Sequence, residues 1–466
     1  MKKTLLFAAS ILAFFSLSAQ TEEDALRFSQ YGLNGTSNYI SKAGAIGALG
    51  GDMTSASYNP AGLGLYTSSE FTMSLGYYGG FTQANSNGLL YNDYRSNMNL
   101  GNLGALFNFK TPNNNFKNTQ IAFGLNRLKA YGNRSIYQRD KVNKSYISHI
   151  IAEGSSDAFM NDFYESYVVD FDTTINDYTS VFQSGEFSQI RSIEESGSLN
   201  EMTFSLSSNY QDLLYFGATV GIPYGNYHRE MSFSETRYNV NSDVATDRYI
   251  YNEKVDLYAS GINFKAGVIA KPISFLRIGA AIHTPTYYNI EDRFYSEVSF
   301  EKTVGGDWEP IFYDLQTPFK FLGSLALVLG DKESKVKGTL SADYEYSDYS
   351  LMKFRTENIL DETTVNNDIN RFFRATNTLK FGGELKLGSL ALRCGYAMME
   401  NPYKSDRNDA SMQYITGGFG IKSKHYFMDF AYAYSFGNSV SREYDYKEID
   451  LKNTQHIAQV TLGVKF

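Results

Sequence analysis

The sequence predicts an all-β protein: a transmembrane antiparallel β-barrel of about 14 strands whose N-terminal segment plugs the lumen. Three features lead to this prediction. They are a secretion signal, strands that alternate apolar and polar side chains, and connections that alternate in length. The 466 residues also include 37 Tyr and 34 Phe, and this aromatic content is typical of β-rich proteins and of membrane-interface girdles.

The first 19 residues have the pattern of a Sec signal peptide. Lys2 and Lys3 precede an apolar stretch from Leu5 to Phe15, and small residues follow it, so we expect cleavage after Ala19. No later apolar run approaches the roughly 20 residues that a membrane helix needs. The mature chain is therefore expected to be either soluble or a β-barrel.

The strands are recognised by side chains that alternate between two faces. Between 335 and 346, one face carries Val336, Leu340 and Tyr344, and the other carries lysines, hydroxyls and carboxylates. The last such segment ends on Phe466, at an apolar position. A soluble sandwich also alternates in this way. The terminal Phe, the abundant Tyr and the alternating connections favour a barrel in a membrane.

The predicted barrel spans residues 70–466. Its even number of strands returns the C-terminus to the side of the N-terminus, which in an outer membrane of the Gram-negative type is the periplasm. The predicted strands are Glu70–Gly79, Asn97–Lys110, Thr119–Tyr131, Asn200–Tyr210, Leu213–Tyr227, Tyr249–Ala270, Ser274–Ile290, Thr317–Gly330, Lys335–Tyr349, Ala375–Leu387, Leu390–Glu400, Met412–Lys422, His425–Gly437 and Gln455–Phe466.

The longest predicted outer loop spans about 132–199. Within it, Ser145–Phe171 has partly helical apolar spacing. We expect this stretch either to receive apolar ligands or to pack as a helix on the barrel rim.

Residues 20–69 form a segment that cannot build its own core. From Ser41 to Gly64 it is rich in Gly and Ala, which bury too little surface to offset the entropy of ordering. A barrel of this size has a lumen that needs a filler, so we predict that 20–69 is a hatch, opening with a short helix through Leu26 and Phe28. Asn59-Pro60-Ala61-Gly62 also suits an ordinary turn, but its glycine-rich setting favours the hatch.

Three motifs in this region resemble the N-terminal region of the FadL-type outer-membrane transporters. They are DALRFSQ (24–30), GAIGALGGDMTSASYNPAGLG (44–64) and YTSSEF (66–71). That family includes transporters of long-chain fatty acids and of aromatic hydrocarbons. The resemblance implies a barrel of 14 strands with a hatch in its lumen, capture of ligands among the outer loops, and lateral exit through the wall.

The resemblance also assigns roles to particular residues. The shared hatch motif falls on Asn59, Pro60, Ala61 and Gly62. Leu26 and Phe28 are expected either beside the ligand or as anchors of the hatch to the wall. Lateral exit takes place at a kink in the third strand, and Gly124 is the candidate position for that kink.

Composition and spacing argue against several other functions. The formal net charge of −8 disfavours a nucleic-acid partner, and no P-loop motif is present. Cys394 is the only cysteine, so no disulfide forms within the chain. We expect no cofactor and no metal, because the five histidines are dispersed: His149, His228, His283, His425 and His456. Asp343, Glu345, Lys380, Glu384 and Asp429 fit the mixed charges of a lumen better than a catalytic site.

The leading functional hypothesis is passive uptake of hydrophobic small molecules, long-chain fatty acids or similar, by a monomer. The alternatives are a plugged porin for polar solutes or haem-related uptake, with His149 as the residue one would nominate, and less favoured, an outer-membrane lipid-modifying enzyme. Expected partners are the ligand, outer-membrane lipids and the barrel assembly machinery, through the strand that ends in Phe466.

Overall fold

The computed structural model describes residues 22–110, 115–153, 157–239, 244–330, 334–357, 359–405, 409–442, 444–445 and 447–466. The predicted signal peptide, residues 1–19, and the first two residues of the predicted hatch lie outside these ranges. None of the helices in the described ranges is long and apolar enough to cross a membrane.

Fourteen antiparallel strands form a closed barrel, which confirms the predicted fold class. The last strand pairs with the first, and two backbone hydrogen bonds of 3.1 Å between Ser69 and Phe466 complete the closure. The barrel strands are β1 (Glu70–Ser86), β2 (Leu89–Lys110), β3 (Phe116–Ala130), β7 (Glu186–Tyr210), β8 (Leu214–Tyr238), β9 (Ala245–Ile273), β10 (Leu276–His283), β14 (Lys320–Leu329), β15 (Val336–Asp348), β17 (Ala375–Leu387), β18 (Leu390–Met399), β19 (Met412–Lys422), β20 (Tyr426–Arg442) and β21 (Glu448–Lys465).

The remaining elements belong to the hatch and to the loops of one barrel end. The hatch holds α1 (Glu22–Ser29), α2 (Ser37–Ser41) and the 3₁₀ turns η1 (Met53–Ala56) and η2 (Pro60–Leu65). The other elements are β4 (Asn133–Val142), α3 (Tyr146–Glu153), α4 (Asp157–Glu165), β5 (Asp170–Asp172), β6 (Asp177–Thr179), η3 (Val181–Gln183), β11 (Tyr287–Ser299), β12 (Thr303–Asp307), β13 (Ile311–Gln316), η4 (Tyr349–Leu351), β16 (Lys353–Arg355) and α5 (Ile359–Phe372).

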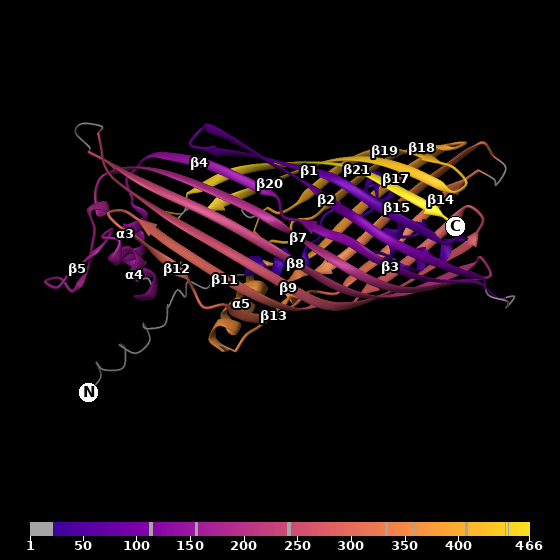
Figure 1. Ribbon diagram of the computed structural model, residues 1–466, viewed down its shortest axis with the longest axis horizontal. Helices are drawn as coiled ribbons and strands as arrows, with labels where there is room; N and C mark the ends of the chain where they lie inside the picture. Colours follow the sequence, from indigo (N-terminus) through magenta and orange to yellow (C-terminus); the bar gives the residue numbers. More distant parts are fainter. Residues whose placement is uncertain are drawn as a thin grey trace.

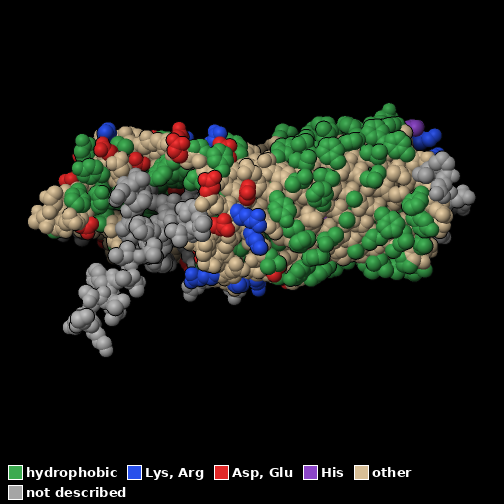
Figure 2. Space-filling view, turned by 90° about the horizontal axis from the view of Figure 1, so that it is seen from below, with side chains coloured by type: hydrophobic (Ala, Val, Ile, Leu, Met, Phe, Trp, Pro, Cys, Tyr) green, Lys and Arg blue, Asp and Glu red, His purple; other side chains and the backbone are tan. Residues whose placement is uncertain are grey.

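The outer surface divides into an apolar part and a polar part. Hydrophobic side chains cover the half of the barrel that carries the C-terminus, and charged side chains lie toward the end that carries α3 and α4 (Figures 1 and 2). Outward-facing residues of the apolar belt stay exposed, for example Leu206 at 57% and Leu340 at 56%. An apolar band of this kind is stable only against hydrocarbon, so it marks the membrane-spanning part of the barrel.

Several strands extend well beyond this belt and are longer than predicted. The loop expected after Gly79 is instead a β1–β2 hairpin that turns at Asn87-Gly88, where both residues have positive φ. The outer loop expected to reach 199 ends sooner, because β7 already begins at Glu186.

Two neighbouring wall strands are interrupted at the outer edge of the belt. The predicted strand Ser274–Ile290 is divided into β10 and β11 around Pro285, and Pro318 separates β13 from β14. The break is bridged by Thr286 and Thr317: the Thr286 amide donates to Thr317 Oγ1 at 2.8 Å, and the Thr317 amide donates to the Thr286 carbonyl at 3.0 Å.

The N-terminal segment from Glu22 to Tyr66 lies inside the barrel, as predicted for the hatch. Its backbone bonds to inward-facing side chains of strands around the wall. Ser341 of β15 donates to the Ala45 carbonyl at 2.6 Å, and Thr416 of β19 donates to the Ser41 carbonyl at 3.0 Å. Further contacts reach β3, β10 and β21.

Two wall glycines allow the hatch backbone to touch the wall. Gly217 of β8 and Gly267 of β9 are register partners. A Cβ atom at Gly217 would lie 2.3 Å from the Pro60 carbonyl oxygen, and one at Gly267 would lie 1.9 Å from Asn59 Oδ1. Any larger side chain at either position would therefore push the hatch away from the wall.

We expect Gly267→Val to unseat the hatch while the barrel still forms. Trypsin should then cleave after Lys42, which is buried in the seated hatch, and heat-modifiable gel mobility should report a folded barrel. The matched control is Gly323→Val, since a Cβ atom there meets nothing within 4 Å. Equal protection of Lys42 in both variants would contradict this account of the seating.

Candidate luminal binding site

An apolar cluster inside the barrel, between the hatch and α5, is the strongest candidate for a binding site. We call it the luminal cluster. Its buried members are Ala25, Leu26, Phe28, Leu128, Tyr131, Leu199, Tyr227, Val255, Leu257, Ala259, Tyr288, Ile290, Tyr313, Leu315, Tyr349, Met352, Phe354, Val365, Ile369 and Phe373. They come from hatch, wall and loop elements, so only the closed barrel brings them together.

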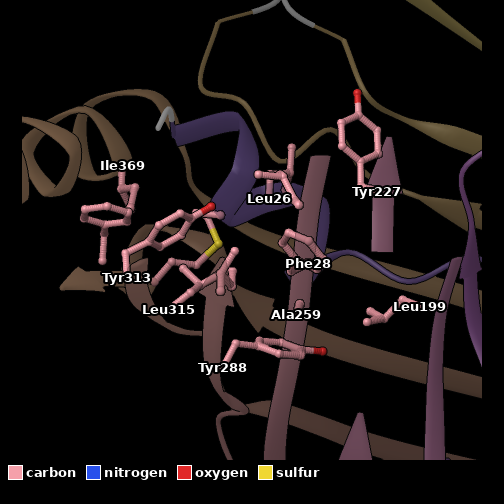
Figure 3. Packing of buried hydrophobic residues seen from close by; sticks show 14 of the residues in the cluster. Leu26, Phe28, Leu199, Tyr227, Ala259, Tyr288, Tyr313, Leu315 and Ile369 are labelled. Atoms are coloured by element: carbon pink, nitrogen blue, oxygen red, sulfur yellow. The ribbon is translucent and has the colours of Figure 1, made fainter. Parts of the chain in front are cut away.

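Helix α1 places two side chains in the middle of this cluster. Phe28 is fully buried, with its ring centroid 5.8 Å from that of Tyr288 and 6.4 Å from that of Tyr131. Leu26 is 6% exposed and lies beside it (Figure 3). The structure thus brings both predicted residues into one apolar site, where they fill the space themselves.

Polar contacts hold the other side of α1. Arg27 forms an ion pair with Asp24, and its guanidinium carbon lies 3.9 Å from the ring centroid of Tyr227. The Arg27 carbonyl accepts from Tyr131 Oη at 3.1 Å and from Lys129 Nζ at 3.3 Å. Desolvation opposes its charge, but nearby Tyr and Glu side chains leave the pKa of Arg27 raised, so it stays protonated.

Helix α5 covers the cluster from the loop side. Val365 and Ile369 of the helix and the adjoining Phe373 are buried in the cluster, and α5 also contacts α1. The loop between β16 and β17 therefore packs against the luminal cluster, and Figure 3 shows Ile369 at the edge of the cluster.

A cavity of about 80 Å³ lies between the luminal cluster and the hatch, and its mixed lining includes the charged side chains of Lys320, Glu345 and Lys380. Lys320 Nζ lies 3.7 Å from the ring centroid of Tyr31, and Lys380 Nζ lies 4.3 Å from that of Tyr58. Glu345 Oε2 accepts from Lys380 at 3.1 Å. The surroundings of the lumen thus change from apolar to charged at the hatch surface.

The predicted hatch motif lies within the hatch. Asn59 Nδ2 donates to the Gly47 carbonyl at 2.7 Å, and Asn59 Oδ1 accepts from the Ala61 amide at 3.2 Å, which caps η2. Pro60 occupies the first position of that turn. The Gly62 carbonyl accepts from the Gly51 amide at 2.9 Å, so the motif joins two distant parts of the glycine-rich segment.

A second cavity, of about 340 Å³, lies on the turn side of the hatch. Arg393 crosses it with two 2.6 Å contacts, to Glu384 and to Asp429. These carboxylates are paired with a cation, as expected for mixed charges that line a lumen.

The third barrel strand does depart from the wall, but not at Gly124. Gly124 lies in uninterrupted pairing with both neighbours, and the first register shift after it comes between Arg127 and Lys129. The chain then steps inward at Gly132, whose carbonyl would lie 2.9 Å from a Cβ atom at Gly80. The kink is therefore several residues beyond the predicted position.

This inward step leaves one edge of β2 without a strand partner. Pairing of β2 with β3 ends at Asn102, and β4 pairs with β7 instead. Over Leu89–Leu100, β2 pairs with β1 alone among the described strands. Met98 on this stretch is 81% exposed within the apolar belt. Side chains therefore connect β2 to its neighbour β7 here: Arg95 Nη1 donates to Glu194 at 2.5 Å.

The outer loop forms helices, as its spacing predicts, and they pack on the extended strands. Ile147, Ile150 and Phe163 are buried against β7, β8 and β9 residues in a separate cluster. His149 on α3 lies with its ring centroid 5.4 Å from that of Tyr444. This arrangement matches the rim-packing alternative.

No group of three His, Cys, Asp or Glu side chains in the described ranges is placed to hold a metal ion. His283 lies inside the barrel, where its Nε2 is 2.7 Å from the Tyr58 carbonyl. His456 lies on the outer surface, where its Nδ1 is 2.6 Å from Tyr432 Oη.

Sequence reasoning missed most of the luminal cluster. Tyr288 and Tyr313 lie on the inner face of strands whose period-2 pattern is broken by Pro285 and Pro318, and α5 falls in what was predicted as a polar loop. The helical spacing of Val365 and Ile369 is the one signal that would have indicated a buried helix face.

Comparison with solved structures places this architecture among known channels. The Pseudomonas putida toluene transporter TodX superposes with a TM-score of 0.56 at 12% identity, covering 93% of this chain and 99% of that one. A Pseudomonas aeruginosa FadL homologue gives 0.56 at 13% identity, covering 94% and 100%. The monoaromatic hydrocarbon channel CymD gives 0.52 at 11%, covering 94% and 99%.

Searches of protein-family models and of curated protein sequences find no match to this chain. At identities of 11–13%, the structural similarity is one of fold. The closed barrel of 14 strands, the N-terminal segment in its lumen and the apolar belt together give this chain the fold of the FadL-type outer-membrane channels.

Proposed function

We propose that the protein is an outer-membrane channel for the passive uptake of hydrophobic small molecules. The observation that carries this proposal is the luminal cluster: an enclosed apolar site in the lumen of a membrane barrel, on the loop side of a polar hatch. An apolar ligand gains roughly 0.8 kcal/mol for each CH₂ group that it buries in such a site. The structural neighbours named as toluene and monoaromatic hydrocarbon channels support the same class of cargo.

The proposed orientation puts the short turns and both termini of the mature chain in the periplasm. The loop end with α3, α4 and α5 then faces outside, where ligands arrive. Assembly through the strand that ends in Phe466, and a monomeric state, remain predictions from the sequence.

In the proposed uptake cycle, a ligand exchanges with the side chains of α1. Leu26 and Phe28 occupy the luminal cluster in the empty protein. A ligand that enters past α5 replaces the Leu26 and Phe28 side chains, so water does not enter the cluster when they leave. The charged floor around Lys320 and Lys380 then opposes further movement of an apolar molecule toward the hatch.

We propose that the ligand leaves sideways, at the free edge of β2. That edge lies within the apolar belt, beside the inward step at Gly132. An exit there leads from an apolar site to hydrocarbon without passage through water. The two alternative functions fit less well, because a polar solute or haem would meet an apolar, filled site above the hatch.

The proposal is tested by measuring uptake of a labelled long-chain hydrocarbon or fatty acid in cells that express the protein. We expect uptake above that of matched cells without it, and a co-purifying apolar molecule in native mass spectra of protein extracted in mild detergent. Steady ion conductance of the intact protein in planar bilayers, with no apolar ligand bound, would favour the porin alternative instead.

The exchange model makes a prediction about α1. Replacing both side chains, Leu26→Ala with Phe28→Ala, removes the groups that compete with a ligand, so affinity for an apolar ligand should rise several-fold. If the two side chains instead line the ligand, affinity falls. Equilibrium binding in detergent separates these outcomes, and Leu351→Ala, at an exposed position, serves as a surface control.

The lateral exit makes a separate prediction at Gly132. A Cβ atom there would lie 3.4 Å from the Tyr78 ring and 3.5 Å from Asn97 Nδ2, so the longer side chain of a leucine would crowd these groups beside the β2 edge. We expect Gly132→Leu to lower uptake several-fold with ligand affinity unchanged. Unchanged uptake would place the exit elsewhere.

A further inference from the structure

Asp292 of β11 lies at the outer edge of the luminal cluster, on the inner face of the wall. It sits directly opposite Leu257 of β9, and its same-face neighbours along the strand are Ile290 and Phe294. Those three residues belong to the cluster or pack against it. The outward-facing residues of β11 at this level are polar, such as Asn289 and Arg293, while the exposed rings of Tyr258 and Phe312 lie on the two neighbouring strands.

The carboxylate of Asp292 has no partner among the described residues. The residue is 1% exposed, and neither of its oxygen atoms makes a hydrogen bond. The two cations whose charge reaches it are engaged elsewhere: Arg27 pairs with Asp24, and Arg229 pairs with Glu253. An unpaired buried carboxylate is among the most unfavourable groups that a folded protein can contain.

A second unpartnered polar group lies beside it. The hydroxyl of Tyr313 is buried and makes no hydrogen bond in the structure. On the adjacent strand β13, Tyr313 is opposite Ile290, and Ile311 is opposite Asp292. Asp292 and Tyr313 are therefore diagonal neighbours on one face, at the roughly 7–8 Å spacing from which one ligand group reaches both.

We propose that Asp292 and Tyr313 bind the hydroxyl group of an apolar ligand whose hydrocarbon part occupies the luminal cluster. This inference rests on the proposed function and predicts that, among hydrophobic cargo, neutral molecules that carry a hydrogen-bond donor bind most tightly.

The chemistry of the two groups selects this class over fatty acids. A ligand hydroxyl donates to the Asp292 carboxylate and accepts from the Tyr313 hydroxyl, which satisfies both groups at once. A ligand carboxylate would place a second negative charge beside Asp292 in a poorly solvated site. A plain hydrocarbon would leave both protein groups unpartnered.

The test compares 1-dodecanol with dodecanoate, which share a chain length and differ in the head group. Binding to the full-length protein in detergent is followed by the fluorescence of Trp308, the single tryptophan. Its ring centroid lies 5.7 Å from that of Phe294, beside the site. The titration is run at pH 8, because burial raises the pKa of Asp292 to about 7, partly offset by Arg27 and Arg229.

We expect the wild-type protein to prefer the alcohol, and Asp292→Asn to lower that preference about tenfold, the usual effect of losing a hydrogen bond to a charged group. The preference is the ratio of the affinities for the two probes. Comparing this ratio between the variant and the wild type cancels the different partitioning of the probes into detergent. Tyr313→Phe, which keeps the ring and its packing, should lower the preference several-fold. The control is Asp314→Asn, on the outward face of β13.

Equal binding of both probes by the wild type, or an unchanged ratio in Asp292→Asn, would overturn the inference and leave the proposed function intact. Binding of neither probe would overturn both. A structural role alone would predict that Asp292→Asn destabilises the empty protein. We expect the opposite, a higher melting temperature, because the substitution removes an unpaired buried charge.

Discussion

The organisation of this molecule depends on the close approach between the hatch backbone and the inner wall. A segment with so few large side chains presents mainly its peptide groups to the wall. These groups are buried there, and each buried peptide group needs a hydrogen-bond partner. The wall supplies these partners from its inner face: Ser341 donates to Ala45, Thr416 to Ser41, and Arg277 to Leu49, while Asp343 accepts from Gly47. Glycines at the contact points bring the two backbones within reach.

This requirement explains why the lumen has two halves. Where the hatch fills the barrel, the inner wall must be polar, and it carries hydroxyls, amides and paired charges. Where α1 and α5 fill the barrel, helices satisfy their own backbone and leave the wall free to be apolar. The luminal cluster therefore begins where the irregular hatch backbone ends, at the two lysines near Tyr31 and Tyr58. The same division confines an apolar molecule to the outer half of the lumen.

Much of this fold could be predicted from the sequence, because period 2 and turn residues are local signals. The barrel class, the strand count and the short helix through Leu26 and Phe28 all followed from residues near one another. The ends of the strands could not be predicted in this way, since the polar outward-facing residues beyond the belt resemble those of a loop. Asn87-Gly88 was the local signal for the long first hairpin, and it went unused.

The site was harder to predict, because its residues meet only through closure of the barrel. Leu26 and Phe28 were identified from the family resemblance, and the structure places both in the cluster. Gly124 was chosen as a kink because glycine permits one, yet the chain bends where β3 loses its partner strand, near Gly132. A kink is decided by which strand pairs with which, and single residues carry little information about that choice.

The occupation of the luminal cluster by α1 also sets how tightly a ligand can bind. A passive channel has to release what it captures, so an apolar pocket that stayed empty and fully accessible would hold its cargo too firmly. When Phe28 and Leu26 must leave before a ligand enters, the free energy of their burial is subtracted from that of ligand binding. Burial of a Phe or Leu side chain contributes about 1.5–3 kcal/mol, and the part of this that is lost on displacement weakens ligand binding. In the proposed uptake cycle, the apolar face of α1 thus provides both the seal of the empty barrel and the means of release.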